Sequence, residues 1–116
     1  MGQTVAVDRH EVEALPWHRF AQRTDILYRI VWKDPWGESY AGVLQLEPGA
    51  EIDRHRHRSG AHHVWVATGT CVVDGRNLAE GSYAFVSPGE MHGVEAGPEG
   101  CTLFYLFLQP DVSREA

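Results

Sequence analysis

Five of the seven histidines of this chain lie between residues 55 and 92. Imidazole is a common ligand of transition metals, and several imidazoles brought together can hold one ion. The segment His55-Arg56-His57 has strand spacing, because residues two apart on an extended chain face the same side, roughly 6 to 7 Å apart. The histidines therefore predict a metal site built across strands from the following residues: His55, His57, His62 or His63, and His92.

The elements that carry these histidines follow from the turn residues around them. Gly60 permits a tight turn, so the strand after it is expected to fold back beside the His55 pair. Neighbouring residues of a strand face opposite sides, so only one of His62 and His63 can face that pair, and alternation alone leaves the choice open. His92 follows the turn Ser87-Pro88-Gly89 and is expected to approach from a further strand.

Short apolar runs separated by turn signals predict an all-β fold in a single domain over residues 1–116, with a barrel core at about 38–109 and an N-terminal extension over 1–24. A weak helical period covers residues 9–15. Asp74-Gly75 predicts a two-residue hairpin, and Gly97-Pro98-Glu99-Gly100 predicts another turn. Strands are expected over these ranges: 4–8, 25–32, 39–46, 51–57, 62–67, 70–73, 76–78, 82–86, 92–95 and 101–109.

The spacing of glycines and histidines resembles the two-motif signature of the cupin superfamily. The first motif is Gly49, five residues, His55-Arg56-His57, four residues, His62, six residues, Gly69. The second is Gly81, five residues, Ser87-Pro88-Gly89, two residues, His92. The resemblance implies a cupin-type double-stranded β-helix, a jelly roll, with one metal ion on His55, His57, His62 and His92. Two departures are His62, where the family usually has a glutamate ligand, and Ser87, where it usually has proline.

An imidazole in place of a carboxylate changes the chemistry that the site is expected to support. Neutral ligands leave a divalent ion with its full charge, which favours anionic bidentate ligands such as enolates. Fe²⁺ or Mn²⁺ is the favoured ion for the oxidative function below, while Zn²⁺, Ni²⁺ and Cu²⁺ also accept imidazole. Glu90, beside His92, is a candidate general base.

The segments around Leu15-Pro16-Trp17 and 48–60 resemble the small cupins that include dihydroxyacetophenone dioxygenase and β-diketone dioxygenases. This resemblance implies a dioxygenase acting on a small enolisable or aromatic ketone. Two alternatives are a non-oxidative zinc or nickel Lewis-acid enzyme, of the polyketide cyclase or isomerase type, and a non-catalytic sensor or binding module. Strand alternation gives candidate substrate-pocket residues: Tyr28, Leu44, Phe85, Tyr105 and Phe107.

Composition limits the partners. The net charge of -6 and pI near 5.5 give no attraction to nucleic acid or anionic lipid, so neither is an expected partner. No run approaches the ~18 apolar residues of a membrane span, and a cytoplasmic location is expected. Cys71 and Cys101 lie in apolar runs and are expected to be buried free thiols. A chain of 116 residues leaves much surface exposed, so a homodimer is expected.

Overall fold

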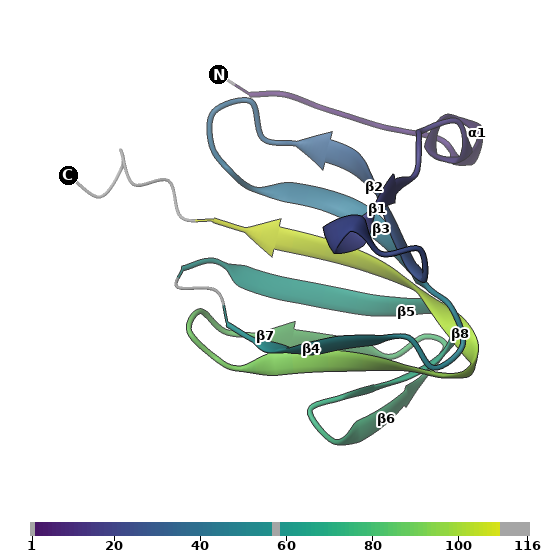
Figure 1. The fold of residues 1–116 in the computed structure, drawn as a ribbon. Helices are drawn as coiled ribbons and strands as arrows, with labels where there is room; N and C mark the ends of the chain where they lie inside the picture. The colour runs from purple at the N-terminus through teal and green to yellow at the C-terminus, as the bar shows by residue number, and fades with distance from the viewer. Residues whose placement is uncertain (1, 57–58, 110–116) are drawn as a thin grey trace.

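The computed structural model describes residues 2–56 and 59–109 and is almost entirely β, as the sequence predicts (Figure 1). Its two helical segments, α1 and the short 3-10 turn η1, are both far too short to cross a membrane, and the described residues contain no helix that could do so. The elements in chain order are α1 (Arg9–Glu13), β1 (His18–Arg19), η1 (Phe20–Gln22), β2 (Ile26–Lys33), β3 (Tyr40–Leu46), β4 (Glu51–His55), β5 (Ala61–Val73), β6 (Arg76–Ala79), β7 (Tyr83–Val86) and β8 (His92–Leu108).

All strand pairs are antiparallel, and the main path runs β1-β2-β3-β8-β5-β6. Off this path, β4 pairs with β8 and β7 pairs with β5. Figure 1 shows β8 bending in its middle, so that its green first part lies beside β4 and its yellow last part beside β3. The sheet is thereby folded on itself, which is the jelly-roll arrangement that the sequence motifs imply.

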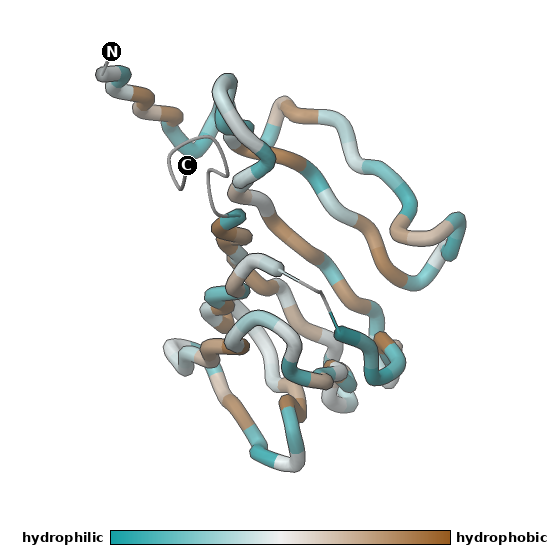
Figure 2. Tube along the Cα trace, turned by 90° about the vertical axis from the view of Figure 1, so that its left-hand side faces the viewer, coloured by the Kyte–Doolittle hydropathy of each residue, from teal (hydrophilic) through white to brown (hydrophobic). Residues whose placement is uncertain are grey.

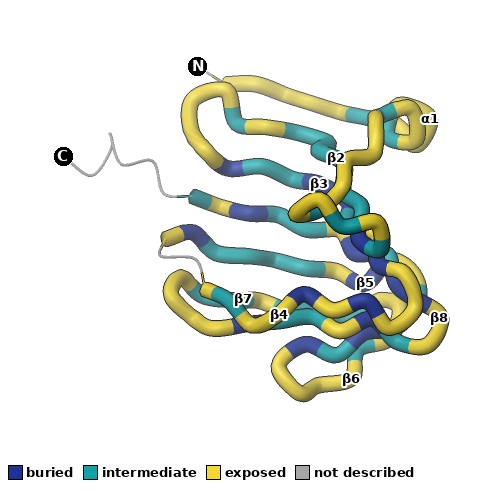
Figure 3. The backbone as a smooth tube through the Cα atoms, viewed as in Figure 1, coloured by how far each residue is buried: buried dark blue, intermediate teal, exposed yellow. Residues whose placement is uncertain are grey.

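The core lies between the two halves of the folded sheet. Along the strands apolar and polar residues are interspersed, as the mixed brown and teal of Figure 2 shows, and buried residues alternate with more exposed ones (Figure 3). Ile26, Leu46 and Leu103 are at most 2% exposed. Cys71 and Cys101 are free and buried beside them, as predicted.

Two predicted breaks in the strands are wrong. β5 continues through Gly69, and β8 continues through the segment 97–100 that was expected to turn. The chain bulges here instead: the β5–β8 register shifts around Gly69, whose φ is +76°. A side chain at Gly69 would put its Cβ 2.1 Å from the carbonyl oxygen of Gly100, so the two strands approach too closely for any residue but glycine.

The N-terminal segment also differs from expectation. The strand predicted over residues 4–8 does not form, and Asp8 instead caps helix α1, with the Glu11 amide donating to its carboxylate at 2.9 Å. The side chain of Glu11 accepts in return from the Asp8 amide, which completes a capping box. The helix itself lies within residues 9–15, where the sequence shows a weak helical period.

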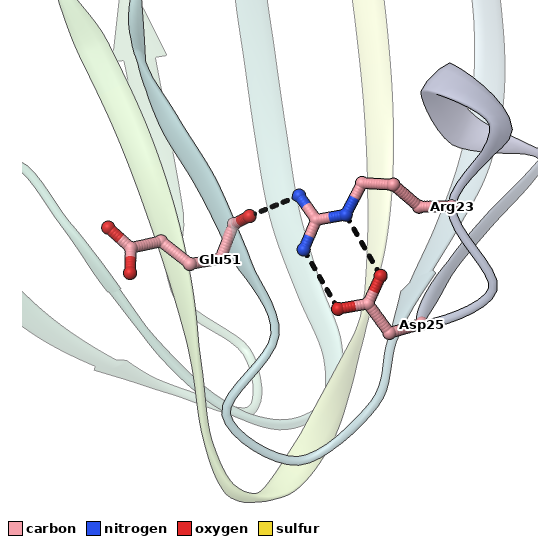
Figure 4. Close-up of polar contacts among 3 residues, drawn as sticks. All are labelled: Arg23, Asp25 and Glu51. Atoms are coloured by element: carbon pink, nitrogen blue, oxygen red, sulfur yellow. Dashed lines mark hydrogen bonds and ion pairs between the residues drawn. The ribbon is translucent and has the colours of Figure 1, made fainter.

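Arg23 fastens the segment before β2 to β4, the strand that carries His55 (Figure 4). Its guanidinium donates two hydrogen bonds to the Asp25 carboxylate, at 2.9 and 2.8 Å, and a third to the backbone carbonyl of Glu51. The hydrogen bond from Arg23 lowers the pKa of Asp25, and Asp25 in turn raises the pKa of Arg23. The Arg23 clamp therefore ties together two segments 28 residues apart.

Candidate metal centre

Three of the predicted histidines come together from three strands. His55 is the last residue of β4 and His92 the first of β8, and the two are direct antiparallel partners with ring centroids 4.3 Å apart. His62, the second residue of β5, has its ring 5.4 Å from that of His92. His92 is buried at 7% exposure, and His55 and His62 are partly buried. The predicted ligand His57 lies outside the described residues.

The structure also separates His62 from His63. His62 pairs with Phe107 across the β5–β8 ladder and shares the inner face of β5 with Val64 and Val66. His63 faces the other side of the sheet, where its Nδ1 and the Tyr83 hydroxyl are hydrogen-bonded at 2.6 Å. Of these two neighbours, His62 is the one that lies with His55 and His92.

Backbone carbonyls orient two of the rings. Nδ1 of His55 lies 2.8 Å from the carbonyl oxygen of Asp53, and Nδ1 of His92 lies 3.5 Å from that of Glu90. A carbonyl only accepts, so in a neutral ring this contact places the proton on Nδ1 and leaves a lone pair on Nε2. Metal-binding histidines are commonly oriented in this way.

The donor set fits a transition metal in its chemistry, because neutral imidazole nitrogen is a common ligand of such ions. The ring centroids of His55 and His62 lie 4.3 and 5.4 Å from that of His92. Within residues 2–56 and 59–109, however, no group of three or more His, Cys, Asp or Glu side chains is arranged closely enough to hold an ion. The ligand roles thus stay predictions, and that of His57 is among them.

Aromatic rings extend inward from the histidines. The Phe107 ring lies edge-on to His62 at 4.7 Å, and Tyr40 lies 5.3 Å from Phe107 and 5.8 Å from Tyr105. Phe107 reaches His62 because Gly60 has no side chain: a Cβ there would lie 2.4 Å from the Phe107 ring. Tyr40 was not predicted. Its position directly opposite Phe107 in the β3–β8 ladder is the signal that would have found it.

Tyr40, next to Phe107, and Tyr105, next to Tyr40, are neutral hydrogen-bond donors. Burial, together with the neighbouring Tyr28, raises the pKa of Tyr40. Burial, Tyr40 and Tyr28 raise the pKa of Tyr105 well above its usual range. The Tyr105 hydroxyl lies over Gly42, where an added Cβ would be 2.7 Å from it. These phenols keep their protons at any ordinary pH.

The other predicted site residues are spread over both faces. Tyr28 and Leu44 are direct partners between β2 and β3, and Leu44 packs against the core. The prediction that Phe85 lines the pocket is wrong. Phe85 is 52% exposed, and its ring lies 5.1 Å from that of His63, on the side of the sheet away from His62. Glu90 is exposed, and its contact with His92 is through its backbone carbonyl.

Two surface hollows lie away from the histidines. One, of about 170 Å³, is formed by β4, the first part of β8 and the turn at Asp74-Gly75. The other, of about 470 Å³, lies beside β6 and is walled by Cys71, Leu78 and Pro98. Neither hollow is lined by a histidine.

Solved structures of the same fold are similar over nearly the whole chain. A cupin from Shewanella frigidimarina described as RmlC-like is 23% identical, with a TM-score of 0.74, and the match covers 98% of this chain and 99% of that one. The polyketide cyclase RemF from Streptomyces resistomycificus is 18% identical, with a TM-score of 0.72 over 95% of this chain and 82% of RemF. Identities this low establish the fold alone.

The anti-sigma protein ChrR, solved in complex with SigE from Rhodobacter sphaeroides, is 18% identical with a TM-score of 0.70. That match covers 83% of this chain and 50% of the other. The search of curated protein sequences finds no relative. The family model of the ChrR cupin-like domain matches residues 5–110. This chain therefore belongs to the ChrR cupin-like domain family, within the cupin superfamily.

Proposed function

We propose that this chain is a metal-dependent dioxygenase that cleaves a small enolisable ketone bound at an all-imidazole centre. The convergence of His55, His62 and His92 from three strands carries the proposal. The sequence adds His57 as a fourth ligand. A divalent ion held by these neutral rings would supply Lewis acidity toward an enolate and a place for oxygen to react.

The other roles in the proposed reaction belong to the aromatic side chains that extend from the histidines: Phe107, Tyr40 and Tyr105. Phe107, 9% exposed and edge-on to His62, keeps bulk water from that side of the cluster. Tyr40 and Tyr105 hold their protons, so they donate hydrogen bonds to a carbonyl or hydroxyl oxygen of a bound ketone. The ring contacts of this cluster join imidazole, phenyl and phenol groups. None of these groups is a carboxylate, so none of them repels an anionic ligand.

A non-oxidative Lewis-acid reaction is the second candidate. An all-imidazole site loaded with zinc or nickel suits carbonyl polarisation without oxygen, and the fold similarity to the polyketide cyclase RemF is consistent with it. A third reading, a binding module without turnover, draws on ChrR, an anti-sigma protein. The three functions differ in what happens to oxygen and to the ketone.

Loading the protein separately with Fe²⁺ and with Zn²⁺ distinguishes them. Each form is mixed with pentane-2,4-dione and with a hydroxyacetophenone, while an oxygen electrode and product chromatography follow the reaction. A dioxygenase consumes one O₂ for each ketone cleaved in the iron form, and the zinc form is inactive. Conversion by the zinc form without oxygen uptake would instead establish the Lewis-acid reaction. Binding of either ketone without conversion by both forms would reject both enzymatic functions.

A further inference from the structure

Cys71 and Cys101 form a pair of buried thiols on neighbouring strands. β5 and β8 lie side by side (Figure 1), and their ladder joins Gly69 to Cys101 and Cys71 to Ala96. Both cysteines belong to the apolar core, where Cys71 is 2% and Cys101 is 5% exposed. The two thiols are hydrogen-bonded to each other. They are the only cysteines of the chain, so each has one intramolecular partner for a disulfide.

The two strands approach each other closely beside this pair. A Cβ added at Gly69 would lie 2.9 Å from the α-carbon of Cys101, and the register of the ladder shifts between Gly69 and Cys71. A disulfide requires α-carbons less than about 7 Å apart. The close approach and the contact between the thiols therefore favour a bond between the two sulfur atoms.

The surface gives a small molecule a route to one of the two thiols. The hollow of about 470 Å³ beside β6 includes Cys71 in its lining but not Cys101. Because both side chains are almost fully buried, a bulky oxidant such as oxidised glutathione is kept away from the sulfur atoms. A molecule as small as hydrogen peroxide fits the hollow, so Cys71 is the thiol that it meets first.

The hydrogen bond between the thiols gives them different roles. The Cys101 thiol donates to the Cys71 sulfur and lowers the pKa of Cys71, an effect that burial partly opposes. The same hydrogen bond, together with burial and the nearby Cys71, raises the pKa of Cys101. The thiolate is the nucleophilic form of cysteine. Cys71 is therefore the sulfur prepared to attack, and Cys101 keeps its proton until the second step.

We propose that Cys71 and Cys101 are a modification site for peroxide, at which hydrogen peroxide converts the two thiols into a disulfide across β5 and β8. In the first step the Cys71 sulfur bonds to one peroxide oxygen, the O–O bond breaks, and the hydroxide that leaves takes the proton of the Cys71 thiol as water. In the second step the Cys101 sulfur bonds to the Cys71 sulfur, the S–O bond breaks, and the Cys101 proton leaves with that hydroxyl as a second water. The two thiols lose two electrons and the peroxide gains them. The site is independent of the reaction proposed at the histidines.

Peroxide treatment of the purified full chain tests the site. A chelator is present to prevent metal-catalysed oxidation, and thiols are counted after denaturation. Trypsin cleaves after Arg76, which lies between the two cysteines, so a linked pair of peptides in a map made without reductant reports the disulfide. Both thiols should be lost together within single chains, and dithiothreitol should restore both. Oxidised glutathione at the same concentration should act at least about tenfold more slowly.

Two matched variants test the separate roles of the sulfurs. In Cys101→Ala the sulfenic acid of Cys71 has no internal thiol to meet, so dimedone should trap it. In Cys71→Ala burial keeps the remaining Cys101 thiol protonated, and its trapping should be at least about tenfold slower. Equal trapping in the two variants would overturn the role assigned to Cys71.

The peptide map of the wild-type chain decides whether the pair is a peroxide site at all. It needs no substitution, so it holds even if circular dichroism shows that a variant does not fold. A folded wild-type chain that keeps both thiols in peroxide, or that links cysteines only between different chains, would overturn the proposal. Oxidation by glutathione disulfide as fast as by peroxide would overturn the choice of oxidant.

Discussion

The proposed metal site takes its ligand from β5 at His62 and not at His63, because the His62 ring lies beside His92 and the His63 ring faces the other side of the sheet. Replacing His62 by alanine removes a ring that lies 5.4 Å from His92, so metal affinity is expected to fall by at least tenfold. His63→Ala is the matched control, since its ring faces the opposite side. Elemental analysis and competition with a chelator measure the effect. Equal metal affinity in the two variants would exclude His62 as a ligand.

Tyr105 is expected to act on substrate binding more than on the metal. Tyr105→Phe keeps the ring against Tyr40 but removes the hydroxyl, and a lost hydrogen bond costs about 0.5–1.5 kcal/mol. KM for the ketone should therefore rise about twofold to tenfold, with metal content unchanged. Because the raised pKa keeps the phenol protonated, wild-type KM should not change through loss of this proton below pH 10. A wild-type KM that matches the variant would remove Tyr105 from the site.

The place of a single residue could be predicted from the sequence where a spaced motif identified it. Where only the alternation of residues along a strand was available, the face on which a residue lies stayed ambiguous. The motif glycines Gly49, Gly69, Gly81 and Gly89 all have positive φ, the conformation that made glycine meaningful in the pattern. Phe85 was assigned to the wrong face because a one-residue difference in phase reverses a strand. Tyr40 was missed because its partner Phe107 is distant in sequence, and only the register brings them together.

The close approach of the paired strands β5 and β8 depends on Gly69. Gly69→Ala puts a Cβ 2.1 Å from the Gly100 carbonyl and adds the strain of a φ of +76°. We expect the free energy of unfolding to fall by more than ~2 kcal/mol, measured by urea denaturation. Gly75→Ala has the same φ of +76° but no atom within 4 Å of its Cβ, so it should cost only about 1 kcal/mol. Equal losses in the two variants would rule out a steric role for Gly69.

The Arg23 clamp should make stability depend on pH. Because Arg23 lowers the pKa of Asp25 in the folded state, the ion pair stabilises above the ordinary carboxyl pKa of 3.8 and loses its effect as pH falls through the lowered value. Asp25→Asn is therefore expected to lower Tm at pH 7, with the difference from wild type narrowing below about pH 4. Glu99→Gln, an exposed acid outside the clamp, is the control. A difference that is independent of pH would contradict the ionic contribution.

Elements were predictable from turn chemistry but not from glycine alone. Asp74-Gly75 does form the connection between β5 and β6, as predicted. Gly97 and Gly100 indicated a turn, yet both lie within β8. A Cβ at Gly97 would clash with Thr70 of β5, and one at Gly100 would lie 2.6 Å from the Leu46 carbonyl oxygen of β3, so both positions require glycine for close packing. A single sequence does not distinguish a glycine that ends a strand from one that lets two strands touch.

At the scale of the whole molecule, β5 carries histidines on both sides of the sheet. His62 lies on the inner side beside His92, and His63 lies on the outer side beside Phe85. The pattern of histidines identified the first face from the sequence. The second face, on the outer side, was not predicted from the sequence, because its members come from three strands and gather only through the register.

The length and bend of strand β8 are expected to affect the order in which this molecule folds. His92 begins the strand and Phe107 lies next to its last residue, yet both rings contact His62. A straight strand of 17 residues would span about 55 Å, so the two ends share a neighbour only after the strand has bent through both halves of the sheet. Such distant contacts form late, since loop closure precedes them. We therefore expect the histidine cluster to be completed late in folding, so that metal binding by the proposed site appears only in the slowest phase of refolding.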